Sequence, residues 1–182
     1  MGLILLRYGE LALKGANRPL FIRRLRHNVR ECLRQNRIEG QVQSVGSRLF
    51  VHTEQVEEAI PPLQRVFGLV SLSPATEAPR DLEAMAEEAV RQAKVAGLGP
   101  EQSFRIAARR ADKSFPHGSP EIGRVLGAAV VQATGARVDL SDRADLTIGV
   151  EVARETVLLY SRVYPGPGGL PLEVAGTRPD PD

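Results

Sequence analysis

Basic side chains are concentrated in two short segments of this sequence, and each segment has a composition suited to binding phosphate groups. The first, residues 18–37, contains seven arginines and one acidic residue, Glu31. Its arginines recur at three- and four-residue steps, so a helix would align several guanidinium groups along one side, where they could follow a phosphate backbone. The arginines on that predicted side are Arg23, Arg26, Arg30, Arg34 and Arg37.

The second segment, residues 105–117, combines cations with aromatic rings. Its members, with Asp112 as the acidic residue between them, are Arg105, Arg109, Arg110, Lys113, Phe115 and His117. Such mixtures suit single-stranded RNA, because unpaired bases stack on rings and guanidinium planes while the cations neutralise phosphates. Either segment alone could be a solvated surface, but two in one chain make nucleic acid the leading candidate for its partner.

Residues that could support catalysis are sparse. The three histidines, His27, His52 and His117, are scattered, and no two stand three or four positions apart to chelate a metal on a helix. Cys32, the single cysteine, falls on the apolar side of the predicted arginine helix. A reactive thiol needs exposure and cationic neighbours, so this position favours a buried structural thiol over a nucleophile.

No cofactor motif is present either. Asp139, Asp142 and Asp145 are spaced by three, but they lack the glycine and final glutamate of a calcium loop. The sequence contains no phosphate-binding lysine loop, no dinucleotide fingerprint and no serine-nucleophile motif. We therefore expect no cofactor, no metal and no catalytic residue in this chain.

Length and charge limit the class of protein further. The 182 residues carry 24 basic and 22 acidic side chains, a net charge of +2. This near-balance hides an asymmetry, because residues 1–75 hold 11 basic and 6 acidic side chains, a surplus of +5, and the rest of the chain has a balance of −3. No apolar run approaches the roughly 20 residues of a membrane span, and the N-terminus lacks the features of a signal peptide. We expect a cytoplasmic protein with no membrane contact.

The elements that would position these residues follow from hydrophobic periodicity. In the first half we predict strand 3–7, helix 19–35, strands 41–45 and 48–53, helix 55–66 with a break at Pro61-Pro62, and strand 69–73. This β-α-β-β-α-β order is the ferredoxin-like arrangement. Ile22, Leu25, Val29, Cys32 and Leu33 form the predicted apolar side of the first helix.

The second half predicts another α/β unit. After a linker at 74–79, the predicted elements are helix 81–96 capped by Asp81, strand 103–108, loop 109–118, helix 119–134, and strands 146–152 and 156–163. Residues 166–182 are rich in glycine and proline, which predicts a tail without a packed core.

Several ordered motifs resemble a known family, the tRNA 4-thiouridine sulfurtransferases, also called thiamine-biosynthesis sulfurtransferases. The family's N-terminal ferredoxin-like domain is similar to L-L-R-Y-G-E at residues 5–10 and K-G-x-N-R at 14–18. Its THUMP domain is similar to four further segments: F-R-I at 104–106, R-R-x-D-K-x-F-P at 109–116, S-P-E-I-G at 119–123 and L-T-I-G-V-E-V at 146–152. The resemblance implies a ferredoxin-like domain at 1–75, a THUMP RNA-binding domain at 76–165 and a Gly/Pro-rich tail at 166–182, in the α/β (α+β) class.

The resemblance also implies a binding site. The family's two domains are expected to grip the acceptor stem and 3′ end of tRNA, which points to Arg105, Arg109, Arg110 and Lys113, with Lys14, Arg18 and the helical arginines in support. In the family, a G-G-L-P stretch like that at 168–171 leads to an ATP-binding domain with an S-G-G-x-D-S loop, which residues 172–182 do not contain.

We therefore expect a tRNA-binding module that presents tRNA for 4-thiouridine-type modification, is non-catalytic by itself, and works with a separate ATP-binding catalytic subunit. Two alternatives stay open. One is an unusual sulfurtransferase that uses Cys32, and the other is a regulatory ferredoxin-like protein that binds a small ligand or a protein.

Overall fold

The computed structural model describes residues 2–9, 18–45 and 48–169. Contacts within the chain divide it into two compact units. Unit 1 comprises Met1–Pro74 together with Arg162–Asp182, and unit 2 comprises Ala75–Ser161. Each unit has its own hydrophobic core. Among the described residues, no helix has the length and apolar character needed to cross a membrane.

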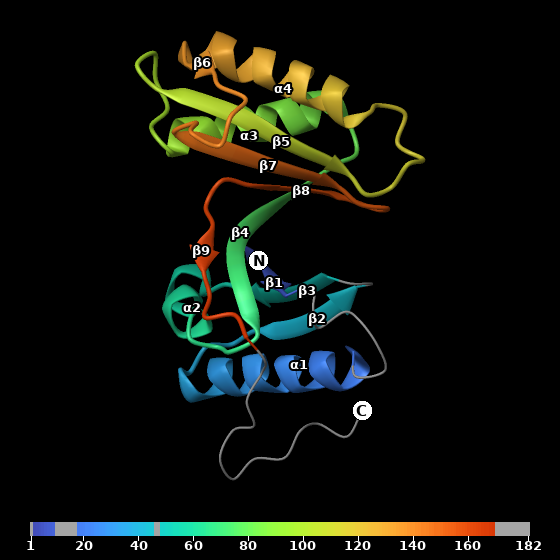
Figure 1. Ribbon diagram of the computed structural model, residues 1–182, viewed down its shortest axis with the longest axis vertical. Helices are drawn as coiled ribbons and strands as arrows, with labels where there is room; N and C mark the ends of the chain where they lie inside the picture. Colours follow the sequence, from blue (N-terminus) through green and yellow to red (C-terminus); the bar gives the residue numbers. More distant parts are fainter. Residues whose placement is uncertain (1, 10–17, 46–47, 170–182) are drawn as a thin grey trace. The chain divides into compact units, whose positions relative to one another are not determined.

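Unit 1 has the ferredoxin-like arrangement (Figure 1). Its elements in chain order are β1 (Gly2–Tyr8), α1 (Arg18–Gln35), β2 (Gln41–Val45), β3 (Arg48–Thr53), α2 (Val56–Leu63) and β4 (Leu69–Ala78). The strands are hydrogen-bonded in the order β2-β3-β1-β4, and a late strand, β9 (Tyr164–Pro165), pairs antiparallel with β4. The predicted β-α-β-β-α-β order is confirmed.

Helix α1 covers one face of this sheet because its apolar residues recur at the helical period. The α1 side chains buried in the core of unit 1 are Phe21, Leu25, Val29 and Leu33. The prediction missed Phe21 and placed Ile22 and Cys32 inside, whereas both are only partly buried. The apolar side of α1 is thus rotated slightly from the predicted one, and the arginines occupy the remainder of the helix surface.

Helix α2 continues through the two prolines that we expected to interrupt it. Pro61 and Pro62 lie near its end, and the helix stops at Leu63. Proline removes the donor for the carbonyl four residues earlier. Those carbonyls belong to Glu57 and Glu58, which are exposed to solvent. Water can therefore replace the missing donors, which lets the helix continue through both prolines to Leu63.

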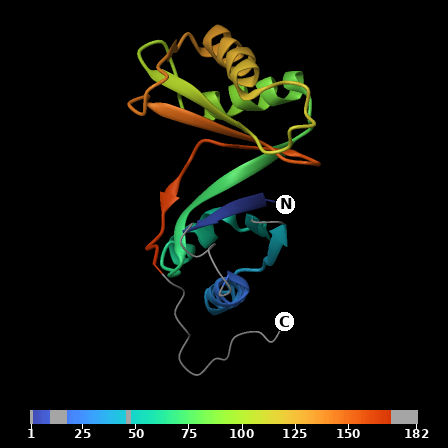
Figure 2. The same ribbon diagram turned by 45° about the vertical axis from the view of Figure 1, so that its right-hand side comes forward.

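Unit 2 packs two helices on one face of a mixed sheet (Figures 1 and 2). Besides the end of β4, its elements are α3 (Leu82–Val95), β5 (Ser103–Arg110), α4 (Ser119–Thr134), β6 (Arg137–Val138), β7 (Leu146–Val152) and β8 (Val157–Tyr160). The strand order is β4-β8-β7-β5-β6, in which β5 runs parallel to both neighbours and β8 runs antiparallel to β7. Phe104, Met85, Ile122 and Leu126 are fully buried between the sheet and the helices.

The ends of the unit 2 helices match their predicted signals. The Asp81 carboxylate accepts a hydrogen bond from the Ala84 amide and caps α3. Helix α4 spans the predicted residues and ends at Gly135, whose φ of 75° lies in the left-handed region that favours glycine. These caps fix where the loops of the candidate site begin and end.

β4 is longer than predicted, since the expected linker at 74–79 is largely strand. The strand runs through Pro74 to Ala78. Its partners change along its length, because Ser71 and Leu72 pair with β9 whereas Thr76–Ala78 pair with β8. Pro74 falls between these two sets of pairs, a position where its missing N–H breaks neither of these ladders.

The ends of β5 and β8 also differ from the predicted ones, because pairing with a neighbouring strand determines where each strand stops. β5 continues to Arg110 rather than ending at Ala108, because its last two residues pair with Glu151 and Val152 of β7. Conversely, β8 covers only Val157–Tyr160 of the predicted 156–163. Two basic residues expected in a loop therefore stand at the end of a strand.

The described part of the expected tail is bonded to unit 1. The Gly166 amide donates to the Val70 carbonyl at 2.9 Å, and the Gly168 amide donates to the Leu69 carbonyl at 2.7 Å. A β-carbon at Gly166 would stand only 2.2 Å from the Leu69 oxygen, so this close approach of backbones requires glycine. Residues 170–182 lie outside the described residues.

Candidate nucleic-acid interface

Strand β5 places two of the predicted RNA-binding arginines on the sheet face opposite the helices. Alternate residues of the strand enter the core of unit 2, namely Phe104, Ile106 and Ala108. The period of two therefore turns Arg105 and Arg109 to the other face. Arg105 Nε donates to Thr147 Oγ1 on β7 at 3.0 Å, which holds this side chain along the sheet. Arg109 is exposed, so its guanidinium is the more accessible of the two.

Arg110 is engaged with the loop that follows β5. Its amide donates to the Ser119 hydroxyl at 3.2 Å, and its guanidinium donates to the Phe115 carbonyl at 2.9 Å. The next two amides both donate to the carbonyl of Val152, at 3.0 and 3.1 Å. These bonds fold residues 111–118 back against the strand end, so Arg110 shapes the loop from within.

The tip of this loop exposes a lysine. The Asp112 carboxylate accepts hydrogen bonds from the Ser114 amide at 3.0 Å and from the Ser114 hydroxyl at 2.8 Å. Such a side-chain turn fixes the backbone locally. These two bonds, together with nearby arginine charge, hold the pKa of the Asp112 carboxyl below its usual value. Lys113 stands between the two bonded residues and is exposed.

Phe115 is buried, which differs from the expectation that its ring offers a stacking surface to a base. It is 3% exposed and belongs to the core of unit 2. The His117 ring stands edge-on to it, with ring centroids 5.4 Å apart, and His117 Nδ1 lies 3.0 Å from a Glu121 carboxylate oxygen. About a third of the His117 side chain is exposed. Of the two predicted rings, His117 is therefore the one that solvent reaches.

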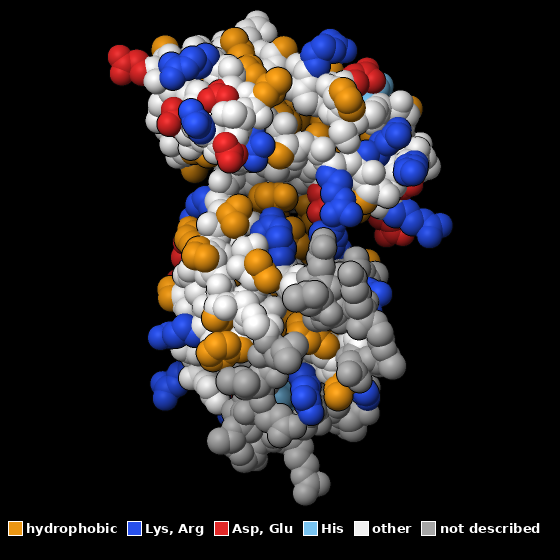
Figure 3. Space-filling view, viewed as in Figure 1, with side chains coloured by type: hydrophobic (Ala, Val, Ile, Leu, Met, Phe, Trp, Pro, Cys, Tyr) orange, Lys and Arg blue, Asp and Glu red, His pale blue; other side chains and the backbone are white. Residues whose placement is uncertain are grey.

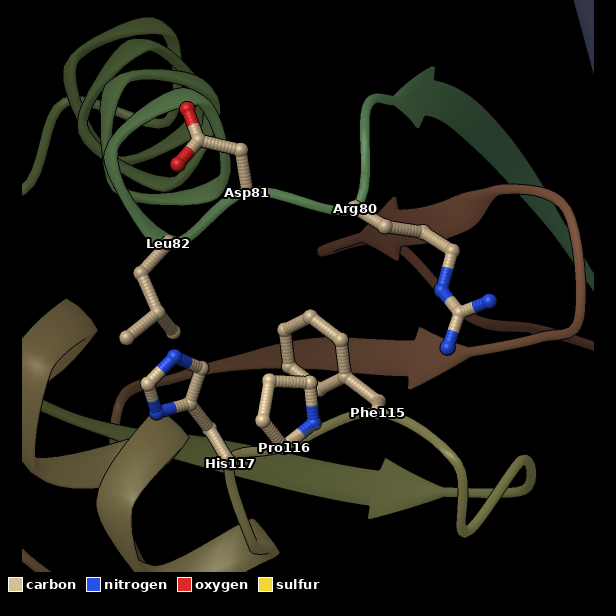
Figure 4. A pocket seen from close by; sticks show the side chains of 6 residues that line it. All are labelled: Arg80, Asp81, Leu82, Phe115, Pro116 and His117. Atoms are coloured by element: carbon tan, nitrogen blue, oxygen red, sulfur yellow. The ribbon is translucent and has the colours of Figure 1, made fainter.

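An open pocket of about 340 Å³ lies beside this loop (Figure 4). Its lining comes from the start of α3 and from the loop, and consists of Arg80, Asp81, Leu82, Phe115, Pro116 and His117. Figure 4 shows the Arg80 guanidinium and the His117 ring on opposite sides of Phe115 and Pro116. The volume is at the small end of the range for ligand sites.

Arg80 was missed by the sequence analysis. It stands alone in its segment, and its side-chain partners include Ser114 and the Arg154 carbonyl, which lie 34 and 74 residues away in sequence. Only the folded chain brings these groups together. In the sequence, Arg80 is a single arginine directly before the helix cap Asp81. A single residue forms no spacing pattern that would mark it as part of a site.

The α1 arginines belong to unit 1 and differ in exposure. Arg18 and Arg34 are exposed, whereas the predicted site residues between them, Arg23, Arg26 and Arg30, are partly buried. Arg34 forms an ion pair with Glu31 one turn earlier, and this hydrogen-bonded pair lowers the pKa of the Glu31 carboxyl. Lys14 lies outside the described residues. Of the two exposed α1 arginines among the predicted site residues, Arg34 is therefore engaged by a neighbouring carboxylate.

Cys32 lies at the margin of the core of unit 1. It is partly buried, and the Asn36 side-chain amide donates to its carbonyl at 2.8 Å. Burial raises the pKa of the Cys32 thiol, although the charge of Arg65 acts in the opposite direction. Among the described residues, no three His, Cys, Asp or Glu side chains are grouped to hold a metal ion.

Figure 3 shows where charge gathers on unit 2. Lys and Arg side chains crowd the side of this unit on which β5 ends, with a few acidic side chains among them. The structure therefore brings Arg109, Arg110, Lys113 and His117 to one end of the unit 2 sheet, whereas Arg105 stands nearer the middle of the strand. This end is the candidate nucleic-acid interface.

Comparison with known protein families gives two matches. Residues 3–73 match the ThiI ferredoxin-like domain, and residues 79–162 match the THUMP domain. The first match falls within unit 1 and the second coincides closely with unit 2.

Curated relatives match nearly the whole chain. It is 42% identical over 175 residues to a probable tRNA sulfurtransferase of Moorella thermoacetica and 38% identical over 178 residues to one of Staphylococcus saprophyticus. Both alignments cover 95% of this chain but only 44% and 42% of the relatives. The chain thus spans less than half the length of these relatives.

Solved structures share the fold of both units. The chain is similar to a Pyrococcus horikoshii protein, with 34% identity, a TM-score of 0.84, and coverage of 94% of this chain and 57% of that one. It is also similar to a 4-thiouridine synthetase crystallised with RNA and ATP, with 27% identity, a TM-score of 0.78, and coverage of 94% and 44%. The chain therefore combines a region that matches the ThiI ferredoxin-like domain with one that matches the THUMP domain, and 95% of it is similar to proteins named probable tRNA sulfurtransferase.

Proposed function

We propose that this chain binds tRNA, grips its acceptor stem and 3′ end, and presents it for 4-thiouridine-type modification without catalysing that reaction by itself. The observation that carries the proposal is the grouping of Arg109, Arg110 and Lys113 at one end of the sheet of a THUMP domain. The relatives named tRNA sulfurtransferase and the synthetase crystallised with RNA support tRNA as the partner.

The two basic groups would have different tasks. Arg109 and Lys113 are exposed cations that can neutralise phosphates near the unpaired 3′ nucleotides. The exposed part of His117, which lines the pocket beside the loop, offers a ring face or edge to an unstacked base. Arg105 and the α1 arginines, including Arg18 at the start of that helix, would contribute contacts to stem phosphates. Lys14, which lies outside the described residues, would add to them. In this division the ferredoxin-like domain spans 1–75 and the THUMP domain 76–165.

The test compares RNA hairpins that differ only at the 3′ end. A labelled acceptor-stem hairpin with four unpaired 3′ nucleotides is titrated with the chain, and fluorescence anisotropy gives the Kd. We expect the same hairpin with a blunt end to bind at least about tenfold more weakly, since base stacking contributes about 1–3 kcal/mol per unpaired base. Equal affinity for the two hairpins would overturn the role of the 3′ end.

A charge-matched pair of variants locates the binding surface. Arg109→Gln removes a cation at the end of β5, and Arg143→Gln removes one from the loop before β7. Because β5 and β7 are parallel, these residues lie at opposite ends of the unit 2 sheet. We expect Arg109→Gln to weaken hairpin binding and Arg143→Gln to leave it nearly unchanged. An equal loss in both variants would mean that net charge, and not this site, governs binding.

The proposed catalytic step needs a separate ATP-binding catalytic subunit. When tRNA, ATP, a sulfur donor and the catalytic region of a relative are combined, this chain should raise the rate of 4-thiouridine formation. The chain with tRNA, ATP and the same sulfur donor, but without the catalytic region, should form none. Product formed without the catalytic region would contradict the non-catalytic assignment, and its loss in a Cys32→Ala variant would then identify the thiol as the nucleophile.

A further inference from the structure

Arg80 links two separate parts of unit 2 to the start of α3. Its guanidinium donates to the Arg154 carbonyl in the turn between β7 and β8. On the loop that follows β5, Arg80 Nη2 lies 3.2 Å from Asp112 Oδ2 and 3.4 Å from Ser114 Oγ. The central guanidinium carbon also lies 5.5 Å from the centroid of the Phe115 ring. One side chain thus contacts three residues of a four-residue stretch, 112–115.

The surroundings of Arg80 differ from those of the exposed cations. Its side chain is 26% exposed, so most of its surface is covered by the protein. Its positive charge is balanced by Asp112, the acidic residue of the loop that follows β5. A cation that is already paired attracts a distant phosphate less than an unpaired one. Lys113, which follows Asp112 directly, is exposed instead.

The residues that Arg80 holds are those that set the direction of the loop. Asp112 fixes the turn around Lys113 through its two bonds with Ser114. Phe115 anchors the other side of the loop in the core, and its carbonyl accepts the guanidinium of Arg110. Loss of Arg80 would leave the Asp112 carboxylate hydrogen-bonded to Ser114 within the loop, and the Phe115 ring without the cation beside it.

We propose that Arg80 is a positioning residue for RNA binding, which holds loop 112–115 so that Lys113 and Arg110 keep the geometry that the RNA requires. The inference rests on the proposed RNA-binding function. Arg80 acts through Asp112 and Phe115 and does not itself need to touch the RNA. Binding by a preorganised loop avoids the cost of ordering it in the complex.

Neutralising Asp112 separates this role from a direct phosphate contact. If only charge mattered, Asp112→Asn would remove a repelling carboxylate and strengthen the binding of a polyanion. If the Arg80–Asp112 pair positions the loop, the same change weakens binding, although an asparagine oxygen can still accept the Ser114 amide. The two explanations therefore predict opposite signs for one substitution.

The experiment measures loop order and RNA affinity separately. Hydrogen exchange is followed in the free protein for the wild type and for Arg80→Gln, Arg80→Lys, Asp112→Asn and the control Arg143→Gln. The reporting amides are those of residues 111, 112 and 115, which donate to backbone carbonyls at 3.0, 3.1 and 3.3 Å. Hairpin Kd values come from anisotropy, and exchange in the middle of α4 confirms that each variant is folded.

We expect Arg80→Gln to speed exchange at these amides and to weaken RNA binding by about tenfold or more, since several bonds to a charged group are lost. Asp112→Asn should do both to a smaller degree, with affinity about two- to fivefold lower. Arg80→Lys should restore little of the slow exchange or of the RNA affinity. Its single ammonium cannot contact Asp112, the Arg154 carbonyl and the Phe115 ring at once, as the planar guanidinium does. Arg143→Gln should leave the exchange of these amides unchanged.

The inference would be overturned by tighter RNA binding by Asp112→Asn, or by unchanged exchange of the amides of residues 111, 112 and 115 in Arg80→Gln. Faster amide exchange in Arg80→Gln without any loss of RNA affinity would also overturn it, because loop order would then have no influence on RNA binding. Failure of the wild type to bind the hairpin contradicts the proposed function instead, and the exchange rates still decide whether Arg80 holds the loop.

Discussion

The ring of Tyr160 lies across the backbone of Gly149, its partner in the antiparallel ladder between β7 and β8. A β-carbon at Gly149 would stand 2.2 Å from Tyr160 Cζ and 2.3 Å from Cε2, distances that no side chain can adopt. The neighbours of Gly149 on β7, Ile148 and Val150, are buried in the core of unit 2. The strand therefore cannot move away from the ring without disturbing that core.

A single methyl group at this position should destabilise the protein. We expect Gly149→Ala to lower the free energy of unfolding by about 1–3 kcal/mol, the usual cost of overpacking, as the Tyr160 ring is displaced. Urea titration followed by circular dichroism measures the change. The matched control is Gly123→Ala, since a β-carbon there meets no atom within 4 Å.

The control should move in the other direction. Gly123 lies inside α4, where alanine is favoured over glycine by up to about 1 kcal/mol. Opposite signs for two Gly→Ala changes in the same unit would tie the loss at Gly149 to the Tyr160 ring. Equal unfolding midpoints for Gly149→Ala and the wild type would instead mean that the ring swings aside freely.

The order of elements could be predicted because local signals coincide with the tertiary structure. Each of these signals involves residues that are close together in the sequence. Examples are the helical periods of α1 and α4, the Asp81 cap and Gly135. Pro74 was misjudged for the opposite reason. A proline usually marks a break, and only the change of strand partners along β4 explains why it is accepted there.

The ion pair between Glu57 and Arg162 should make stability depend on pH. Glu57 Oε1 lies 2.9 Å from Arg162 Nη2, and this hydrogen bond lowers the pKa of the Glu57 carboxyl in the folded state. A carboxyl with a lowered folded pKa contributes stability above its ordinary pKa, and that contribution disappears as the pH falls through the folded value. Glu57→Gln should therefore be less stable than the wild type at pH 7.

The difference should vanish in acid. Melting temperatures of the wild type and Glu57→Gln, measured from pH 7 down to pH 3, should converge below the ordinary glutamate pKa of about 4.3. Because the pair is largely exposed, 0.5 M salt should reduce the difference at pH 7. A constant gap across this range would show that Glu57 acts through packing of α2 and not through its charge.

The thiol of Cys32 should react slowly. Burial raises its pKa, so a smaller fraction is thiolate at pH 8 than for an exposed cysteine. We expect the rate of alkylation by iodoacetamide to be well below that of the same chain unfolded in guanidinium, and to go on rising above pH 9. A fast reaction at pH 7 would contradict the raised pKa and revive the alternative in which Cys32 transfers sulfur.

The candidate site was only partly predictable, because composition identifies residues that can bind but not those that are accessible. Arg109 and Lys113 stand exposed at the strand end, whereas the Phe115 ring is taken by the core. An aromatic residue in a basic loop has the same sequence pattern in both cases. Arg80 could not be found at all, since its partners come from segments that only folding brings together.

Salt dependence should count the phosphate contacts made by the exposed cations. Each phosphate neutralised by Lys or Arg adds about 0.7 to 0.9 to the negative slope of log K against log salt concentration. Arg109→Gln and Lys113→Gln should each reduce the slope for the overhang hairpin by about this amount, and the double variant by about twice as much. Arg143→Gln should retain the wild-type slope. Reduced affinity with an unchanged slope in the double variant would show that these side chains act without contacting phosphates, and the contacts would then have to be sought among the α1 arginines.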